Sequence, residues 1–224
     1  INMTGNIITS GLSTAGIGLD GSDSNTINIT GNISTSGNFG YGIYIDEDLD
    51  GSDSNTINMT GDISTSGSQS YGVYIATSND NTTSITGNVA TTGNSAYALI
   101  LINSDSSNTS LIGNTSTTGN SAYALILDNS DSNTTSLIGN ITTTGDDARG
   151  LYLHDSDSNT TTLTGNISTI GLNAPGMHLF SGSDSNTINM TGNISTTGTA
   201  SRGLDLSTSD SNTFNITGDI TTTG

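Results

Sequence analysis

A short motif, Thr-Gly-Asn or a close variant, recurs along the whole chain at a nearly constant interval. Its glycines are Gly5, Gly31, Gly61, Gly87, Gly113, Gly139, Gly165, Gly192 and Gly218, at intervals of 26, 30, 26, 26, 26, 26, 27 and 26 residues. A fixed period of this size is typical of a solenoid, in which each repeat forms one coil stacked on the next. The extra residues fall at Asp46–Asp50 and near Ser181–Ser183, both just before Ser-Asp-Ser-Asn-Thr. That segment is therefore predicted to be a length-tolerant turn.

Within one period, apolar and polar residues alternate. Ile27, Ile29 and Ile33 are separated by polar residues, and after a glycine-rich break Ile43 and Ile45 flank a tyrosine. Alternation with a period of two, rich in β-branched residues, predicts strands. No segment offers the apolar stripe of a helix, so each coil is expected to contain about three short strands.

Aligning the coils gives columns of equivalent residues. Three columns are aliphatic or Met throughout and are predicted to form the core: Met3, Ile29, Met59, Ile85, Leu111, Leu137, Leu163, Met190 and Ile216; Ile17, Ile43, Val73, Leu99, Leu125, Leu151, Met177 and Leu204; and Leu19, Ile45, Ile75, Leu101, Leu127, Leu153, Leu179 and Leu206. An intervening column admits charge and is predicted to face outward: Gly18, Tyr44, Tyr74, Ile100, Ile126, Tyr152, His178 and Asp205.

These patterns predict an all-β fold, a right-handed parallel β-helix (β-solenoid) with about 26 residues per coil, slightly more than eight coils and three short strands per coil. Successive coils would pair through parallel ladders about 4.8 Å apart, and the right-handed preference of parallel crossovers sets the expected hand. The chain 1–224 is interpreted as a single solenoid segment. Because both termini fall inside a repeat, we expect it to be a fragment of a longer repetitive protein.

The couplet "TGNISTSGNFGYGIYI" (Thr30–Ile45), echoed in "GDISTSGSQSYGVYI" and "GNVATTGNSAYALIL", resembles the repeats of bacterial autotransporter passenger domains and related large surface adhesins. The resemblance covers the whole chain, although its signature is a generic pattern of Gly, Asn, Thr and aliphatic residues. It implies a pectate-lyase-like right-handed parallel β-helix that is exported to the cell surface.

Charge and composition exclude several classes of partner. The net charge is −18, lysine is absent, and Arg149 and Arg202 are the two basic residues. Nucleic acid and anionic membranes both require clustered Lys and Arg, so neither is an expected partner. Cysteine is absent, so no disulfide or thiolate metal site is predicted. No 18-residue apolar run predicts a membrane span, so direct membrane insertion by this segment is not expected.

The Ser-Asp-Ser-Asn-Thr turn carries two polar columns. The first consists of Asp23, Asp53, Asn79, Asp105, Asp131, Asp157, Asp184 and Asp210; the second consists of Asn25, Asn55, Asn81, Ser107, Asn133, Asn159, Asn186 and Asn212. Stacked Asn side chains are predicted to hydrogen-bond to each other along the axis and to tolerate a left-handed backbone. The Asp residues either cap their own turns and face solvent or bind calcium, for which the spacing of Asp155, Asp157 and Asn159 is suggestive. That spacing lacks the Glu and Gly of an EF-hand.

Two outward rows pose further questions. Thr30, Asn32, Ser34 and Ser36 recur as Thr60, Asp62, Ser64 and Ser66 and as Thr191, Asn193, Ser195 and Thr197. This face resembles the hydroxyl rows of ice-binding solenoids, but Ile112, Ile138 and Ile170 interrupt it, and a solvated polar face explains it equally.

A tyrosine column, Tyr41, Tyr71, Tyr97 and Tyr123, is continued by Arg149, Pro175 and Arg202 and is expected to face outward. Its rings would either stack sugars or stack on one another.

Catalysis is not expected. A lyase needs a basic residue next to an acidic cluster, but the two arginines lie two coils apart and away from the acidic turn. The stacked Asp residues share one environment, so nothing separates their pKa values. His154 and His178 have no Ser or Cys partner in a motif. The sequence therefore predicts no catalytic, cofactor-binding or metal-binding residue, with calcium at the Asp turns left open.

The leading hypothesis is a non-catalytic, extracellular structural or adhesive rod: a stalk, surface adhesin or filament-forming segment. The alternatives are an ice-binding solenoid and a glycan-binding or tailspike-like β-helix. Expected partners are further coils of the same chain, end-to-end copies of itself, and surface glycans or cell receptors. Unpaired strands at open solenoid ends favour the first two.

Overall fold

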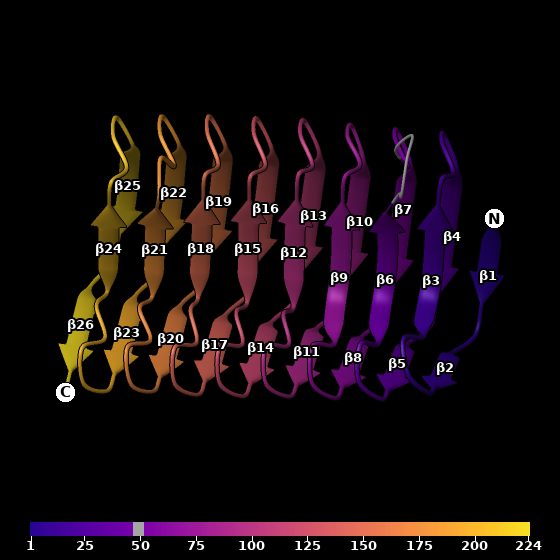
Figure 1. Ribbon diagram of the computed structural model, residues 1–224, viewed down its shortest axis with the longest axis horizontal. Coiled ribbons are helices and arrows are strands. Elements are labelled where there is room, and N and C mark those ends of the chain that lie inside the picture. The colour runs from indigo at the N-terminus through magenta and orange to yellow at the C-terminus, as the bar shows by residue number, and fades with distance from the viewer. Residues whose placement is uncertain (47–51) are drawn as a thin grey trace.

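The computed structural model describes residues 1–46 and 52–224, and its described residues form 26 β-strands. No helix occurs among them, and so none that is long and apolar enough to cross a membrane. The strands form three parallel sheets that run along a rod (Figure 1), two with nine strands and one with eight.

Each coil contributes one strand to each sheet. The first sheet comprises β1 (Asn2–Thr4), β4 (Thr26–Thr30), β7 (Thr56–Thr60), β10 (Thr82–Thr86), β13 (Asn108–Ile112), β16 (Thr134–Ile138), β19 (Thr160–Thr164), β22 (Thr187–Thr191) and β25 (Thr213–Thr217). The second comprises β2 (Ile7–Ser10), β5 (Ile33–Ser36), β8 (Ile63–Ser66), β11 (Val89–Thr92), β14 (Thr115–Thr118), β17 (Ile141–Thr144), β20 (Ile167–Ile170), β23 (Ile194–Thr197) and β26 (Ile220–Thr223). The third comprises β3 (Ala15–Asp20), β6 (Tyr41–Asp46), β9 (Tyr71–Ala76), β12 (Leu99–Ile102), β15 (Leu125–Asp128), β18 (Leu151–His154), β21 (Met177–Phe180) and β24 (Leu204–Ser207).

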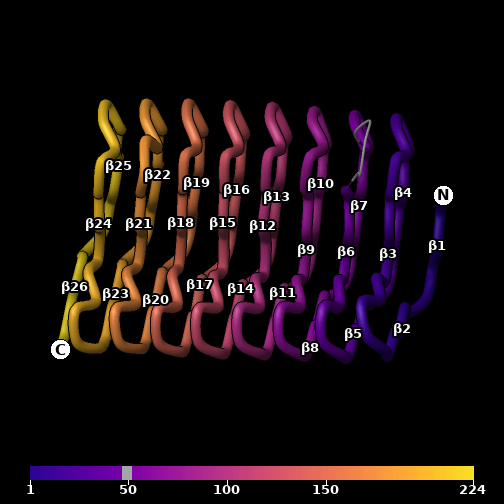
Figure 2. The backbone as a smooth tube through the Cα atoms, viewed as in Figure 1, coloured from indigo at the N-terminus to yellow at the C-terminus, as the bar shows by residue number. Residues whose placement is uncertain are grey.

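The hand of the coil can be followed in Figure 1. The nearer strands of the third sheet run upward, the strands of the first sheet run downward behind them, and successive coils advance to the left. This is a right-handed coil, as the crossover preference predicts. Figure 2 shows the two termini at opposite ends of the rod. The predicted fold class is thus confirmed.

The register of the sheets confirms the three predicted core columns. Ile29 pairs with Met59, Ile43 with Val73 and Leu101 with Leu127, and side chains of these columns are buried in one continuous core. The expected period-two burial is visible in β4, where Ile27 and Ile29 are buried and Thr26 and Thr30 are exposed. Only the terminal coils leave members of these columns partly uncovered, as at Met3 and Leu206.

The core also contains a column of threonines that the sequence analysis missed: Thr35, Thr65, Thr91, Thr117, Thr143, Thr169 and Thr196. The alternation in the second strand places them inward, between the outward residues of each Ile-Ser-Thr-Ser segment. Some find a partner, as when the Thr117 hydroxyl donates to the carbonyl of Ala122 at 3.0 Å. The hydroxyls of Thr35, Thr65, Thr143 and Thr196 have no hydrogen-bond partner among the described residues.

The recurring glycine of the Thr-Gly-Asn motif marks the corner between the first and second sheets. At Gly139 the backbone φ is +151°, and a Cβ added there would lie 2.0 Å from the carbonyl oxygen of Gly113 in the preceding coil. Only glycine allows both the backbone conformation and the close approach of stacked coils. The period of the sequence therefore reflects a steric requirement at this corner wherever one coil stacks on the preceding one.

The single-residue insertion lies where it was predicted, in the turn between β21 and β22, where Gly182 has a φ of +76°. Of the longer insertion at 46–50, Asp46 ends β6. Its other residues lie outside the described part of the chain.

Candidate functional site

The Asp column of the turn has an axial bonding role. In every Asp of the column before Asp210, the Oδ1 atom accepts the backbone N–H of the equivalent residue in the next coil: Asp105 accepts from Asp131 at 2.7 Å, and Asp131 accepts from Asp157 at 2.6 Å. Asn79 occupies the same column and accepts from Asp105 at 2.7 Å, so the bond requires an oxygen and not a charge. Within the described residues, no three His, Cys, Asp or Glu side chains lie close enough to hold a metal ion. The calcium hypothesis therefore stays a prediction without a preformed cluster behind it.

The Asn column corrects one detail of the sequence analysis. These side chains bond to backbone groups and not to each other: the Oδ1 of Asn133 accepts from the N–H of Ser107 at 2.8 Å, and its Nδ2 donates to the carbonyl of Ser104 at 2.8 Å. The left-handed backbone belongs to the preceding residue, such as Ser132 with a φ of 58°. Asn133 is 1% exposed, so the amide replaces water for backbone groups buried by stacking.

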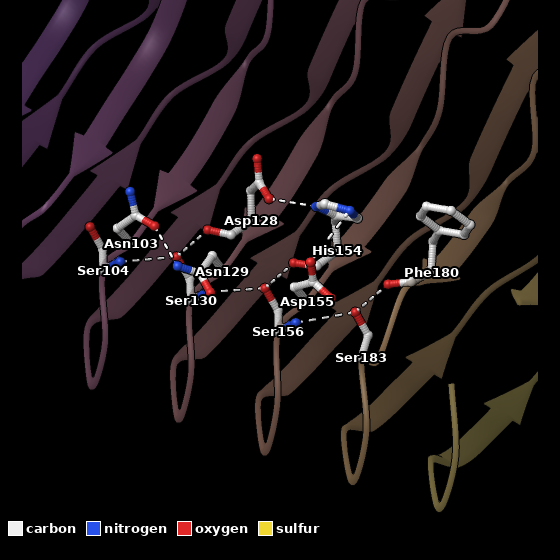
Figure 3. A network of polar contacts seen from close by, with 10 residues as sticks. All are labelled: Asn103, Ser104, Asp128, Asn129, Ser130, His154, Asp155, Ser156, Phe180 and Ser183. Atoms are coloured by element: carbon white, nitrogen blue, oxygen red, sulfur yellow. Dashed lines mark hydrogen bonds and ion pairs between the residues drawn. The ribbon is translucent and has the colours of Figure 1, made fainter. Parts of the chain in front are cut away.

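The first serine of the turn forms a second buried ladder, which was also missed. Ser104, Ser130, Ser156 and Ser183 are fully buried. The N–H of Ser130 donates to the hydroxyl of Ser156 at 3.0 Å, and that hydroxyl donates to the carbonyl of His154 at 2.8 Å (Figure 3). Repetition of a serine was the available signal, but a polar residue in a turn does not by itself reveal burial.

The predicted hydroxyl face is divided between two sheets. Thr30 ends β4 and Ser34 lies in β5, with Asn32 in the corner between them. The Oδ1 of Asn32 accepts the N–H of Asp62 in the next coil at 2.9 Å. All three side chains face outward as expected, and Ile112, Ile138 and Ile170 are each about half exposed, at 49%, 51% and 49%. The rows therefore form two narrower faces, and ice binding stays a prediction.

The outer face of the third sheet differs from the other two. It carries all seven tyrosines of the chain together with both histidines and both arginines: Tyr41, Tyr44, Tyr71, Tyr74, Tyr97, Tyr123, Tyr152, His154, His178, Arg149 and Arg202. The outer faces of the other two sheets carry small polar residues with a few aliphatic ones. Chemical variety in this rod is thus confined to one face.

The tyrosine column stacks on itself. The rings of Tyr71, Tyr97 and Tyr123 are stacked with centroids 5.1 Å apart at each step. A ring covered on both faces offers its edge, and not its face, to a sugar, so self-stacking is the better account of this column. Burial raises the pKa of Tyr71 to about 12, and the neighbouring tyrosines contribute.

Two residues of the intervening column are buried although the column faces outward. The intervening column does point outward, but Ile100 and Ile126 within it are each only 3% exposed. The adjacent column carries the bulky rings of Tyr97 and Tyr123, which indicates that these rings cover the two isoleucines. The tyrosine stack therefore acts as a second, thin apolar layer on the outside of the sheet.

The cations of this face lie toward the C-terminal half. The guanidinium of Arg149 lies over the rings of Tyr123 and Tyr152, with its carbon 4.8 Å and 4.6 Å from their centroids, and it donates a hydrogen bond to the Tyr123 hydroxyl. Arg202 pairs with Asp205 at 2.7 Å. As predicted from the sequence, the two arginines lie away from the Asp column of the turn.

The two histidines belong to neighbouring columns. His154 Nδ1 lies at hydrogen-bond distance, 2.7 Å, from the Asp128 carboxylate of the preceding coil, and both side chains are open to solvent (Figure 3). His178 lies in the column of Tyr152. Burial, and next the charge of Arg149, lower the pKa of His178.

Comparison with protein-family models, with curated proteins and with solved structures finds no match for this chain. The fold is therefore established from the chain's own structure, and the likeness to autotransporter and adhesin repeats is carried forward only as a proposal.

Proposed function

We propose that this solenoid is a non-catalytic structural or adhesive rod that works outside the cell, as a stalk, a surface adhesin or a filament-forming segment. The observation that carries this proposal is the uniform axial bonding of the coils. Most coils repeat the same backbone, Asn, Ser and Asp bonds to their neighbours, with Asn79 and Ser107 as substitutes in two columns, in three sheets whose register is continuous. Such an architecture forms a long, rigid rod, and its stability increases with the number of stacked coils.

The ends of the rod support association along its axis. At the N-terminal coil Met3 is 37% exposed, and at the other end Ile220 is 47% exposed, although the columns of both residues are buried in the middle coils. The strands β1 and β25 each have one paired neighbour, so each leaves an edge free for another strand. A further coil or a second copy would satisfy both the unpaired backbone and the apolar surface.

The environment of the acidic residues supports a non-catalytic role. A glycoside hydrolase requires two carboxyl groups with unequal environments. The Asp residues of the turn instead repeat one environment, and the Oδ1 of each accepts a backbone N–H of the next coil. The resemblance to exported surface repeats supports the extracellular location.

The axial part of the proposal is tested with a pair of variants in one terminal strand. Ile220→Lys places a charge where a further coil would bury it, whereas Thr221→Lys points the same charge outward from the same strand. We expect the unmodified chain and Thr221→Lys to lengthen with concentration in electron micrographs and sedimentation, and Ile220→Lys to stay short. Particles of one length at every concentration would contradict end-to-end association.

The location is tested by labelling intact cells of the organism that makes the protein. An antibody raised against the folded solenoid should bind intact cells as well as permeabilised ones. Labelling that requires permeabilisation would overturn the extracellular assignment.

A further inference from the structure

At the N-terminal end of the rod, the aromatic columns of the third sheet stop at β3. Ala15 and Gly18 of β3 occupy the two columns in which β6 carries Tyr41 and Tyr44. A ligand site in a repetitive rod requires a place that differs from its neighbours, and this step in the aromatic layer is such a place.

The step forms an open depression of about 470 Å³ lined by Ser13, Ala15, Gly18, Asp20, Tyr41 and Tyr44. The small residues of β3 form its floor. Above Gly18 the space is open, because an added Cβ would meet only the Cβ of Ala15, at 3.9 Å. The two tyrosines form its wall and Asp20 lies at the end of the same strand as the floor.

The two wall rings form a corner. The centroids of Tyr41 and Tyr44 are 4.8 Å apart and their planes meet at 62°. A sugar ring stacks on a flat aromatic platform, whereas a corner of two rings fits a compact, rounded group such as a methylated ammonium ion, which aromatic rings attract through their negative faces. The shape of the wall therefore favours a cation over a sugar.

Charge favours the same ligand. The Asp20 carboxylate is exposed and makes no hydrogen bond or ion pair with any described residue. The Tyr44 hydroxyl donates to the Asp46 carboxylate at 3.0 Å, which holds that ring in place beside a second negative charge. The chain as a whole carries a net charge of −18 and draws cations toward it.

We propose that this corner, formed by Tyr41, Tyr44 and Asp20 over the floor of Ala15 and Gly18, binds a quaternary ammonium group. The floor and the rings supply an apolar lining that suits a weakly hydrated cation, and the carboxylate supplies the counter-charge. This site goes beyond the structural role proposed above and does not depend on it. A coil stacked on the free edge of β3 would form a second wall beside the depression.

The binding is tested by nuclear magnetic resonance titration of the whole chain with choline. We expect the ring signals of Tyr41 and Tyr44 to shift with a dissociation constant on the order of 1 mM, while sodium at equal ionic strength leaves them unchanged. The neutral analogue 3,3-dimethylbutan-1-ol, which has the same shape without the charge, should not bind. Equal binding of the neutral analogue, or binding of methyl glucoside without choline, would overturn the proposal.

The source of the ammonium group is separated by comparing choline with phosphocholine. The carboxylate of Asp20 repels a phosphate, so a free or peptide-borne ammonium should bind more tightly than phosphocholine. Tighter binding of phosphocholine would show that the corner also binds the phosphate group. Because none of its residues is a cation, that result would overturn the assigned chemistry.

Variants then locate the site. Gly18→Tyr continues the aromatic column across the floor and should abolish binding, whereas Gly18→Ala should leave most of it. Tyr41→Ala should weaken binding about fivefold or more, and Asp20→Asn roughly threefold. Tyr97→Ala removes a ring of the same ladder far from the corner and serves as the control. Each variant is first checked for unchanged strand content by circular dichroism. Unchanged binding in a folded Gly18→Tyr or Tyr41→Ala variant would place the ligand elsewhere and refute the assignment.

Discussion

The Ser-Asp-Ser-Asn-Thr turn and the outer face of the third sheet lie along the same rod, yet they use repetition in opposite ways. In the turn, the same side chains recur because each one bonds to the backbone of an adjacent coil, as Asn133 does with Ser107. On the outer face, the residue changes from coil to coil, from Gly18 through Tyr44 and Ile100 to His178. Positions that repeat hold the coils together, and positions that vary are free to acquire a ligand.

The largest loss in the free energy of unfolding is expected at the recurring glycine, where stacking of the coils leaves no room for a side chain. Gly139→Ala forces a Cβ against the carbonyl of Gly113, so we expect unfolding or a loss of more than about 4 kcal/mol in the free energy of unfolding. Gly5→Ala is the matched control, because Gly5 has a φ of +135° but no atom within 4 Å of an added Cβ. Denaturant melts of both variants measure the difference. Equal losses for the two variants would show that the positive φ, and not the close approach of the preceding coil, makes glycine necessary at this position.

The next effect separates buried from exposed ladders. Asn133→Ala leaves buried backbone groups of Ser104 and Ser107 without partners, which should cost about 2 to 4 kcal/mol. Asn114→Ala removes a bond of the same kind, from the N–H of Asn140 at 2.9 Å, but in an exposed column, where water replaces it. We expect about 1 kcal/mol or less for that variant. Thermal or urea unfolding provides the comparison, and similar losses would count against burial as the cause.

A smaller effect tests the outer aromatic layer. Tyr97→Ala removes the ring that stacks with both Tyr71 and Tyr123, and we expect it to expose Ile100. The free energy of unfolding should fall by about 1 to 3 kcal/mol. Thr92→Ala, at an exposed outward position of the second sheet, should change it by less than about 0.5 kcal/mol. Urea unfolding followed by circular dichroism measures both. If the tyrosine variant matched the threonine variant, the layer would contribute nothing to the fold.

The same layer predicts a pH dependence. Burial raises the pKa of Tyr71 to about 12 from an ordinary value near 10. A group with a raised folded pKa contributes stability that is fully present below its unfolded pKa and is lost as the pH rises through the folded one. The melting temperature should therefore fall between about pH 10 and about pH 12. Tyr71→Phe should reduce that fall, and a spectrophotometric titration of tyrosinate should show late ionisation. An ordinary titration midpoint would contradict burial of the ring.

The contrast between the two regions also explains what the sequence could predict. Columns such as Leu101, Leu127 and Leu153 follow from period and alternation alone, because a stacked coil must bury the same positions each time. The Asn and Asp columns of the turn were visible for the same reason. The partner of each polar side chain was not visible, since the choice between a backbone N–H and a neighbouring amide depends on distances that a column alignment does not contain.

The outer face was less predictable. Alternation placed Ile100 outward, but it is only 3% exposed beside the stacked rings of the adjacent column. The depression at Ala15 and Gly18 likewise arises from the absence of rings in one coil, which an alignment records only as two small residues. Packing on an outer face depends on side-chain conformation and not on period.

The smallest effect is expected at the Asp column, where charge and bonding separate. Asp131→Asn keeps an oxygen to accept the N–H of Asp157, as Asn79 already does for Asp105. It should change stability by less than about 0.5 kcal/mol, with relief of repulsion between neighbouring carboxylates on the favourable side. Because the carboxylates already serve the turns, we expect calcium and chelator to leave the melting temperature of the chain unchanged. If calcium raised the melting temperature and the Asp131→Asn variant reduced that rise, the carboxylate charges of the turn column, and not only their oxygen atoms, would contribute by binding calcium.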